Sequence, residues 1–166
     1  MYILNLKENN CEWKRVVMSK PPGYRHQHTL VGDDSIKNAT IKYLFGGINT
    51  PDNTFYNDLW ILDLSPGIVY DTNQPEVSGI KFVLQTTTGN KPRERKGHCA
   101  FIYHRKMFIY GGQCQDINFD TMHDIFFLDL EKFSWNSFEN KSAEISPRSL
   151  FSCSWYNEST LIVPLV

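Results

Sequence analysis

The chain has 166 residues, enough for a domain with a sizeable apolar core, and its 41% hydrophobic and 14% aromatic content excludes intrinsic disorder. Its 17 basic and 18 acidic residues nearly cancel, so no overall field draws the chain to nucleic acid or to an anionic membrane surface. No secretory signal pattern opens the sequence, and no apolar run approaches the length of a membrane span. We therefore expect a cytoplasmic protein, with a nuclear location as the alternative.

Two short strands are expected in the first residues, at Tyr2–Leu6 and Glu12–Val17, the second carrying Trp13. A turn rich in proline and glycine then leads to an arginine and two histidines within Pro22–His28. The segment 33–40 lacks strand patterning and is expected to be a long polar hairpin loop. Closely spaced turn signals of this kind favour short strands over helices.

A hydrophobic strand that ends in two glycines, Tyr43–Gly47, precedes Asn57–Leu64, whose last six residues are apolar at nearly every position. Such a run is typical of a short strand with both faces covered. Paired glycines after a strand suit backbone at positive φ, so we expect Gly46 and Gly47 to have a structural role. The segment Pro66–Ser78 follows, and we expect it to be an inserted, mobile loop.

The same pattern then returns, with its glycine pair 65 residues further on. Pro92–His98 repeats the turn with its arginine and histidine, Phe108–Gly112 repeats the strand with its glycines, and His123–Leu130 repeats the apolar run. A third start, Pro147–Cys153, leads to Leu161–Val163 without a further glycine pair. Two repeat units are therefore whole and two are partial.

An aromatic residue follows each apolar run, and it can wedge between neighbouring sheets: Trp13, Phe82 and Trp135. With the Gly-Gly strand ends and the D-[LI]-[WF]-x-L-D strands, this pattern resembles the kelch repeat family. The resemblance implies an all-β fold, a fragment of a kelch-type β-propeller with four-stranded blades, strands a to d from the channel outward. It implies about three blades, two complete and two partial, at 1–17 (strands c and d), 18–90 (with an insertion near 66–78), 91–141 and 142–166 (strands a and b).

We expect that the strands of this chain are too few to close a propeller ring by themselves. Propellers close with four to eight blades, more than these residues supply. An open stack would expose the apolar faces of its end sheets. We expect either the remainder of the propeller or a second chain to complete the ring, and we do not expect a stable isolated monomer.

Rim loops of propellers carry recognition, and the loops that precede the a strands are basic and aromatic here. We expect a partner protein, with an acidic peptide or a C-terminal tail as its bound segment, at Tyr24, Arg25, His26, Arg93, Arg95 and Lys96. The alternative interpretation is that Arg25 and Arg95 pair with acidic groups of adjacent blades and serve the structure.

No enzyme, cofactor or metal site is expected. The five histidines show no metal-ligand spacing, and His28 and His98 recur at one repeat position, which favours a structural role. The four cysteines lie at wide and irregular intervals, so we expect reduced thiols and neither a disulfide framework nor a zinc site.

Within the family, Tyr24-Arg25-His26, the Gly-Gly units and Phe151-Ser152-Cys153 resemble the kelch domain-containing protein 10 type of substrate receptor of cullin-RING ubiquitin ligases. That resemblance implies recognition of a client's C-terminal tail. A cytoskeletal or signalling scaffold is the alternative, and a propeller-type enzyme is a less favoured one. No nucleic acid and no membrane are expected as partners.

Overall fold

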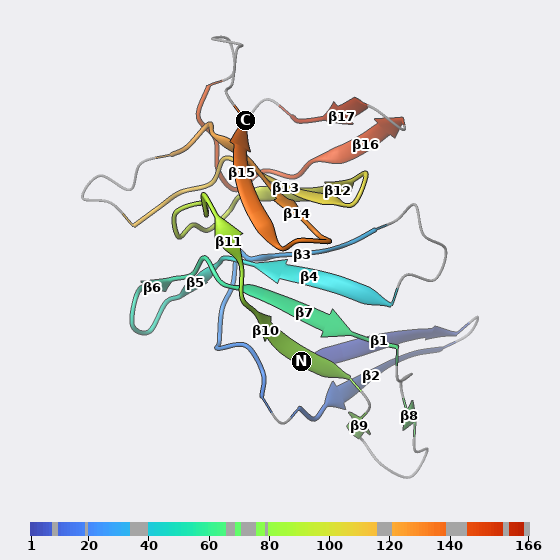
Figure 1. Ribbon diagram of the computed structural model, residues 1–166. Coiled ribbons are helices and arrows are strands. Elements are labelled where there is room, and N and C mark those ends of the chain that lie inside the picture. The colour runs from blue at the N-terminus through green and yellow to red at the C-terminus, as the bar shows by residue number, and fades with distance from the viewer. Residues whose placement is uncertain are drawn as a thin grey trace.

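The regular elements of the protein are all β-strands, arranged as a stack of twisted sheets (Figure 1). The computed structural model describes residues 1–7, 10–18, 20–33, 40–65, 69–70, 76–78, 80–115, 121–138, 146–157 and 160–164. No helix occurs within these ranges, and therefore none that could span a membrane. The predicted all-β class is confirmed.

Two complete four-stranded sheets form the middle of the stack, and we call them the first and second blades. Neighbouring strands a to d are antiparallel in both, and their backbone registers repeat from one blade to the other. The first blade consists of β3 (Thr29–Gly32), β4 (Ile41–Phe45), β7 (Leu59–Asp63) and β10 (Lys81–Gln85). The second consists of β12 (Cys99–Tyr103), β13 (Lys106–Tyr110), β14 (Ile125–Asp129) and β15 (Ser134–Phe138). The long loop expected at 33–40 joins β3 to β4, and residues 34–39 lie outside the described residues.

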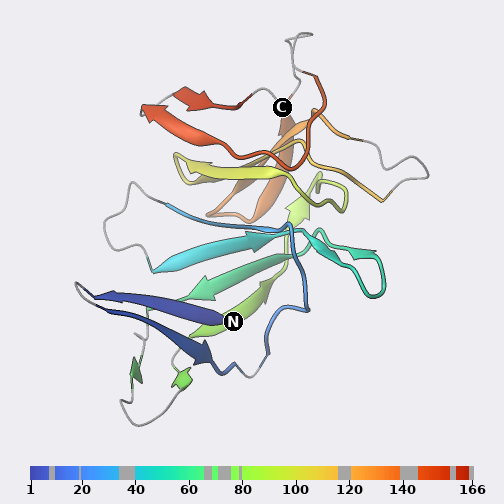
Figure 2. The ribbon, with the colours of Figure 1, turned by 180° about the vertical axis from the view of Figure 1, so that it is seen from behind.

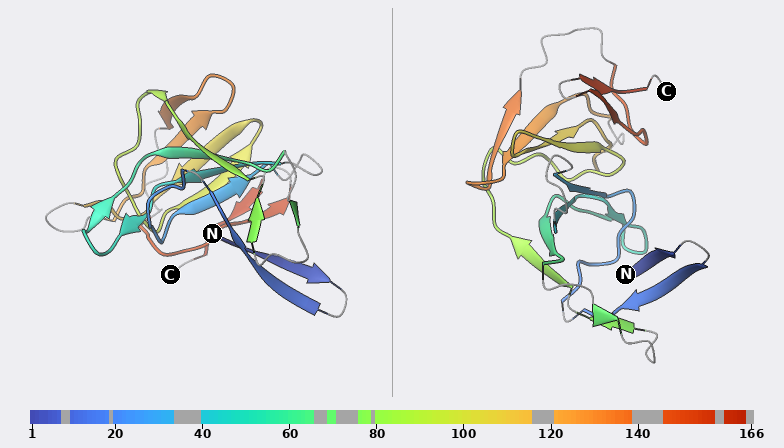
Figure 3. Two further views of the ribbon diagram at one scale, coloured as in Figure 1. Left: turned by 90° about the horizontal axis from the view of Figure 1, so that it is seen from below. Right: turned by 90° about the vertical axis from the view of Figure 1, so that its right-hand side faces the viewer.

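A further sheet lies at each end of the stack, as the views in Figures 1 and 3 agree. At the N-terminal end, β1 (Tyr2–Lys7) pairs with β2 (Asn10–Val16). At the C-terminal end, β16 (Ser154–Asn157) pairs with β17 (Thr160–Ile162). These hairpins correspond to the strands c and d, and a and b, that the repeat pattern predicts at the two ends.

The insertion expected at Pro66–Ser78 as a mobile loop contains strands in the part that the structure describes. Val69–Tyr70 (β8) and Glu76–Ser78 (β9) form a short antiparallel hairpin, and β9 runs parallel to β2 along its outer edge. In the same way β11 (Thr88–Gly89) pairs in parallel with β15. Unpaired outer strands invite aggregation, and these additions cover two of them.

Apolar side chains fill the seams between sheets, which is why strand residues of both faces are apolar. The two blades lie side by side in the stack (Figure 2). In the seam between them, Phe45 and Leu59 pack against residues of the second blade: Ile102, Met107, Ile109, Leu128 and Trp135. Trp135 reaches Phe45 with 5.2 Å between ring centroids, so its predicted wedge role is confirmed. Phe82 likewise packs into the cluster that joins the first blade to the N-terminal sheet, whereas Trp13 is exposed.

Both glycine pairs adopt the positive φ that the sequence predicts. Gly46 and Gly111 have φ of 67° and 64°, and Gly47 and Gly112 both have 98°. A Cβ on Gly46 would lie 2.7 Å from the carbonyl oxygen of Arg95, in the neighbouring blade. The glycines therefore permit both the turn and the close approach of the next blade.

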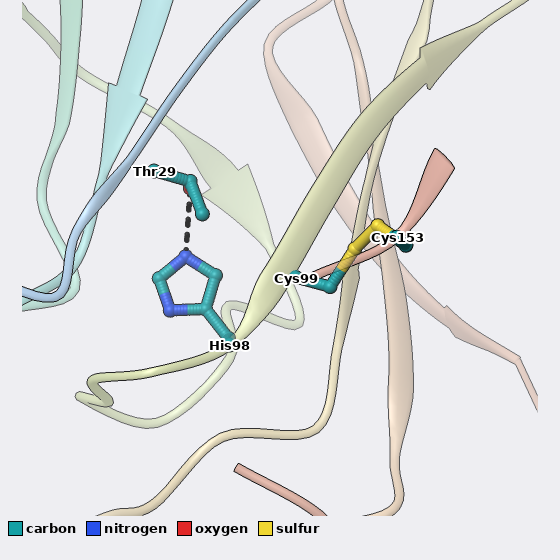
Figure 4. Close-up of a disulfide and its surroundings, with 4 residues drawn as sticks. All are labelled: Thr29, His98, Cys99 and Cys153. Atoms are coloured by element: carbon teal, nitrogen blue, oxygen red, sulfur yellow. Dashed lines mark hydrogen bonds between the residues drawn. A yellow bond between two sulfur atoms is a disulfide. The ribbon is translucent and has the colours of Figure 1, made fainter. Parts of the chain in front are cut away.

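The expectation of four reduced thiols is wrong for one pair. Cys99 at the start of β12 and Cys153 just before β16 form a disulfide, with their Cα atoms 6.2 Å apart (Figure 4). Among the cysteines of the described residues, Cys11 and Cys114 are not part of a disulfide. The bond joins the C-terminal sheet to the second blade, and repeat packing brings the two cysteines together although 54 residues separate them.

Candidate functional site

The loops before strand a and the loops between strands b and c meet at one rim of the stack. In the first blade the amide of His26 donates to the carbonyl of Ile48 at 3.0 Å, and the reverse bond is equally long. Lys96 and Gln113 exchange the same two bonds in the second blade, at 3.0 and 2.9 Å. The loop between b and c of the first blade continues into the hairpin β5 (Ile48–Asn49) and β6 (Thr54–Phe55), which projects from the stack (Figures 1 and 2).

Arg25 anchors the first of these loops. Its guanidinium donates to both carboxylate oxygens of Asp58, at 2.6 and 3.0 Å, and also to the carbonyls of Gly46 and Gly23, each at 3.2 Å. The group lies over the ring of Tyr56, 3.9 Å from its centroid. A bidentate pair with additional acceptors satisfies most guanidinium donors, so Arg25 fixes the rim loop to its own blade.

Arg95 repeats the arrangement in the second blade. It donates to both carboxylate oxygens of Asp124, at 2.6 and 3.0 Å, and to the carbonyls of Gly111 and Arg93, at 2.9 and 3.1 Å. The side chain of Arg95 is 0% exposed. Arg148, at the third position, donates to the carbonyls of Ser146 and Pro164, at 3.2 and 3.0 Å.

The structure thus corrects the expectation that Arg25 and Arg95 face a partner. Their guanidinium groups are enclosed and pair with acidic groups, as the alternative interpretation of the sequence expects, with one difference. The acidic groups, Asp58 and Asp124, belong to the same blade and not to an adjacent one. Sequence reasoning missed these aspartates, although each precedes strand c at the same repeat position.

The other expected site residues lie at the surface of the rim. Tyr24 is 92% exposed, and His26 and Arg93 are exposed as well. The ring Nε2 of His26 lies 3.1 Å from the hydroxyl of Thr50. Lys96 is half-buried and reaches the preceding blade, with its ammonium 5.3 Å from the ring centroid of Phe55 in β6. The structure therefore brings Lys96 against the β5–β6 hairpin, which the His26 loop contacts by its backbone.

Hydrogen bonds between blades hold neighbouring rim loops in place. The amide of Arg95 donates to the carbonyl of Tyr56 at 3.1 Å, and the amide of Gly47 donates to the carbonyl of Arg95 at 2.8 Å. A second series of backbone hydrogen bonds joins residues of positive φ. The amide of Leu150 donates to the carbonyl of Gly97 at 2.8 Å, and the amide of Gly97 donates to the carbonyl of Gln27 at 2.9 Å. The exposed side chains therefore stand on a backbone that both blades fix.

The two repeat histidines are kept neutral in this seam. Burial, with a smaller effect of the charges on Arg95 and His28, lowers the pKa of His98 to about 3. Burial, followed by the Arg25 charge, also lowers the pKa of His28. His98 Nε2 lies 2.8 Å from the Thr29 hydroxyl, across the seam (Figure 4), and its ring packs edge-on against Phe45. These contacts agree with the expected structural role.

Among the residues that the structure describes, no three His, Cys, Asp or Glu side chains are grouped so that they could hold an ion. The chemistry that the rim does offer is a set of cationic and aromatic side chains on fixed loops.

Comparison with known proteins gives a consistent result. A family model described as the KLHDC2/KLHL20/DRC7 Kelch-repeats domain matches residues 1–163. Host cell factor 1 of Rattus norvegicus is 29% identical over 99% of this chain and 8% of its own length. Adagio protein 3 of Arabidopsis thaliana is 32% identical over 81% of this chain and 19% of its own length. The chain thus spans less than one fifth of either relative.

Solved structures share the fold. A chain in the "Cryo-EM structure of RAG in complex with one melted RSS and one unmelted RSS" has a TM-score of 0.70 at 12% identity, covering 98% of this chain and 49% of that one. The "Structure of YjhT" has a TM-score of 0.63 at 16% identity, covering 92% and 47%. The chain therefore corresponds to about half of either neighbour.

Proposed function

The chain belongs to the kelch-repeat family, whose propellers serve as protein-interaction modules, and we propose that it binds a partner protein through the rim of its first and second blades. The contact residues are Tyr24, His26, Arg93 and Lys96. Arg25 and Arg95 hold the loops beneath them. The observation that carries the proposal is the separation of roles at this rim: Arg25 and Arg95 are paired with Asp58 and Asp124, whereas the neighbouring side chains are exposed or, for Lys96, half-buried.

An acidic peptide segment or a free C-terminal carboxylate fits this surface best. The contact residues combine two basic groups with an exposed tyrosine and an exposed imidazole, and no acidic residue is among them. A hydrogen bond to a charged group contributes about 1.5 to 3 kcal/mol, so two such contacts are enough for measurable affinity. Salt screens exposed charge pairs, so raised ionic strength should weaken the complex.

Delivery of the bound protein to a cullin-RING ubiquitin ligase is the more specific form of this proposal. It is supported by the resemblance of Tyr24-Arg25-His26 and the Gly-Gly units to such substrate receptors. A cytoskeletal or signalling scaffold would use the same rim. Recovery of a cullin adaptor together with the full-length protein separates the two roles, because a scaffold has no need of that adaptor.

The test of rim binding is partner recovery from cell extract with the full-length protein. We compare wild type with the double variant Arg93→Ala, Lys96→Ala, and we use Lys132→Ala, an exposed lysine in the turn between strands c and d of the second blade, as the matched control. The double variant should weaken partner binding about a hundred-fold or more, since each of the two lost charge-assisted contacts is worth about 1.5 kcal/mol or more. Equal recovery of all three proteins would remove the rim as the binding site.

The class of ligand is tested separately with synthetic peptides. An acidic peptide with a free C-terminus is compared with its C-terminal amide and with a peptide in which Asn and Gln replace Asp and Glu. Loss of binding on amidation alone identifies terminal recognition, and loss on neutralisation alone identifies an acidic segment. Equal binding by all three would contradict the charge-based proposal.

A further inference from the structure

The tip of the β5–β6 hairpin has the features of a site for covalent modification. Thr50 is followed by Pro51, and every residue from Thr50 to Thr54 is exposed. The hairpin projects from the stack (Figures 1 and 2), and its first strand is bridged to His26 of the rim. Proline has no amide hydrogen, and one class of protein kinase selects serine or threonine with proline directly after it. Thr50 therefore has the sequence and the exposure of an acceptor for such a kinase.

The base of this hairpin is fixed, whereas its tip can open without disturbing a blade. Ile48 and Phe55, which pair with each other at the base, are both buried. The two strands have two residues each and form a sheet separate from those of the blades. The Asn53 amide closes the turn by donating to the Thr50 carbonyl at 3.4 Å. So short a hairpin is marginally stable by itself, and local opening gives the tip the extended form that a kinase cleft accepts.

Three serine or threonine residues of the chain precede a proline, and they differ in their surroundings: Thr50, Ser65 and Ser146. The hydroxyl of Thr50 lies 3.1 Å from Nε2 of His26. Ser65 lies in the turn that follows β7, and the carbonyl of Ser146 accepts a hydrogen bond from Arg148 at 3.2 Å. Of these three, Thr50 places its hydroxyl against a residue that we assign to partner contact.

We propose that phosphorylation of Thr50 by a proline-directed kinase prevents partner binding at the rim. In that reaction the hydroxyl oxygen of Thr50 attacks the γ-phosphorus of a nucleoside triphosphate, the bond to the nucleoside diphosphate breaks, and the hydroxyl proton passes to a base of the kinase. The product carries a charge of about −1.5 to −2 and three strong acceptor oxygens. The modification itself does not depend on the proposed function, whereas its effect on binding rests on it.

The phosphate would lie among the residues that we assign to partner contact. Nε2 of His26 would donate to a phosphate oxygen in place of its present contact with the hydroxyl. The carboxylate of Asp52, at the same tip, repels a phosphate, which favours the side that His26 occupies. Lys96 lies against the same hairpin, with its ammonium 5.3 Å from the ring centroid of Phe55. The phosphate thus occupies the imidazole and adds negative charge where an acidic segment would bind.

The modification is tested on the folded, full-length protein with a proline-directed kinase and magnesium ATP. Mass spectrometry should find phosphate on Thr50. A linear peptide with the sequence of residues 46–56 is the positive control for recognition by the kinase. A folded protein without phosphate on Thr50 would overturn the proposal, whether or not the peptide is modified.

The placement of the phosphate is tested by the ring signals of isotopically labelled histidines in NMR spectra. The His26 signal should shift when Thr50 is phosphorylated, because the phosphate replaces the hydroxyl beside its ring. His104 is also exposed, in the turn between β12 and β13, and its signal should stay unchanged. An unmoved His26 signal in the phosphorylated protein would contradict the contact on which the proposal depends.

The effect on binding is tested with the acidic peptide that has a free C-terminus. Kinase treatment should weaken its binding to wild type at least about ten-fold, because one charge-assisted contact is lost and like charges repel. Thr50→Ala controls for phosphate at other sites and should bind the peptide equally before and after treatment. Equal weakening of both proteins, or of neither, would overturn the effect of Thr50. If untreated wild type does not bind the peptide, the proposed function fails and the effect on binding fails with it, whereas the modification is judged by the mass spectra alone.

Discussion

Trp135 and Trp13 occupy the same position of the repeat but lie in opposite environments. Trp135 stands between two sheets and is 1% exposed, whereas Trp13 stands on the outer face of the N-terminal sheet and is 66% exposed. The difference lies in the neighbouring sheet and not in the local strand, because both residues pair with a leucine of strand c in the same way. Each sheet of this protein is therefore completed by the next one, as in other repeat architectures.

The largest expected difference in stability comes from replacing each of the two tryptophans by alanine. Trp135→Ala should lower the free energy of unfolding by about 3 to 5 kcal/mol, because it leaves a cavity between the blades. Trp13→Ala should lower it by less than about 0.5 kcal/mol, as for other exposed positions. Urea denaturation of the two variants measures both values. Similar losses would mean that Trp13 is buried in solution, contrary to its exposure here.

A second contrast concerns ion pairs, which divide in the same way into enclosed and exposed. Asp124→Ala leaves the enclosed guanidinium of Arg95 without its carboxylate, and removal of one partner from such a pair costs about 3 kcal/mol or more. Glu131→Ala removes the partner of Arg105 from a pair whose side chains are both exposed, which should cost less than about 1 kcal/mol. Thermal unfolding of the two variants measures the difference. If the losses were equal, the Arg95 pair would have no special structural role.

A smaller effect should come from the neutral histidine in the seam. The unfolded chain takes up a proton on His98 near pH 6.5, but the folded protein does so only near pH 3. The stabilising contribution is therefore complete above pH 6.5 and declines as the pH falls towards 3, by about 2 kcal/mol for this group at pH 5.

His98→Phe is the matched control for this pH dependence. The third repeat has Phe151 at the corresponding position, where it packs edge-on against Tyr110 at 5.5 Å, the same centroid distance as His98 to Phe45. The variant should fold and should lose part of the decline in stability between pH 7 and pH 5. An unchanged pH profile, measured by urea denaturation at each pH, would show that His98 has the same pKa in the folded and unfolded states.

The sequence predicts the fold in those parts where the repeat itself carries the information. Gly46 and Gly111 follow hydrophobic strands and have the expected positive φ, and the runs at Leu59 and Ile125 form the strands β7 and β14. The residues Val69–Tyr70 and Glu76–Ser78 were not recognised as strands. Their pairing depends on the edge of β2, a distant strand that supplies backbone partners whatever the local sequence.

The site was predicted less completely, because burial decides the role of each residue. Arg95 and Arg93 are both arginines of the loop before strand a of the second blade, yet Arg95 is enclosed beside Asp124 and Arg93 is exposed. The aspartate repeats at one position before strand c, and that signal could have identified the arginine partners. The Cys99–Cys153 pair had no such signal, since only the contact between the second blade and the C-terminal sheet brings the two residues together.

Arginine-specific labelling of the folded protein with a dicarbonyl reagent, followed by mass spectrometry, tests the division of roles at the rim most directly. Arg25 and Arg95 should react only as the protein unfolds, because their guanidinium groups are enclosed and paired with Asp58 and Asp124. Arg93 should react in the native state, because it is exposed. If Arg95 were labelled as fast as Arg93 in the folded protein, the enclosed arginines would be part of the accessible surface, and their structural role at the rim would be contradicted.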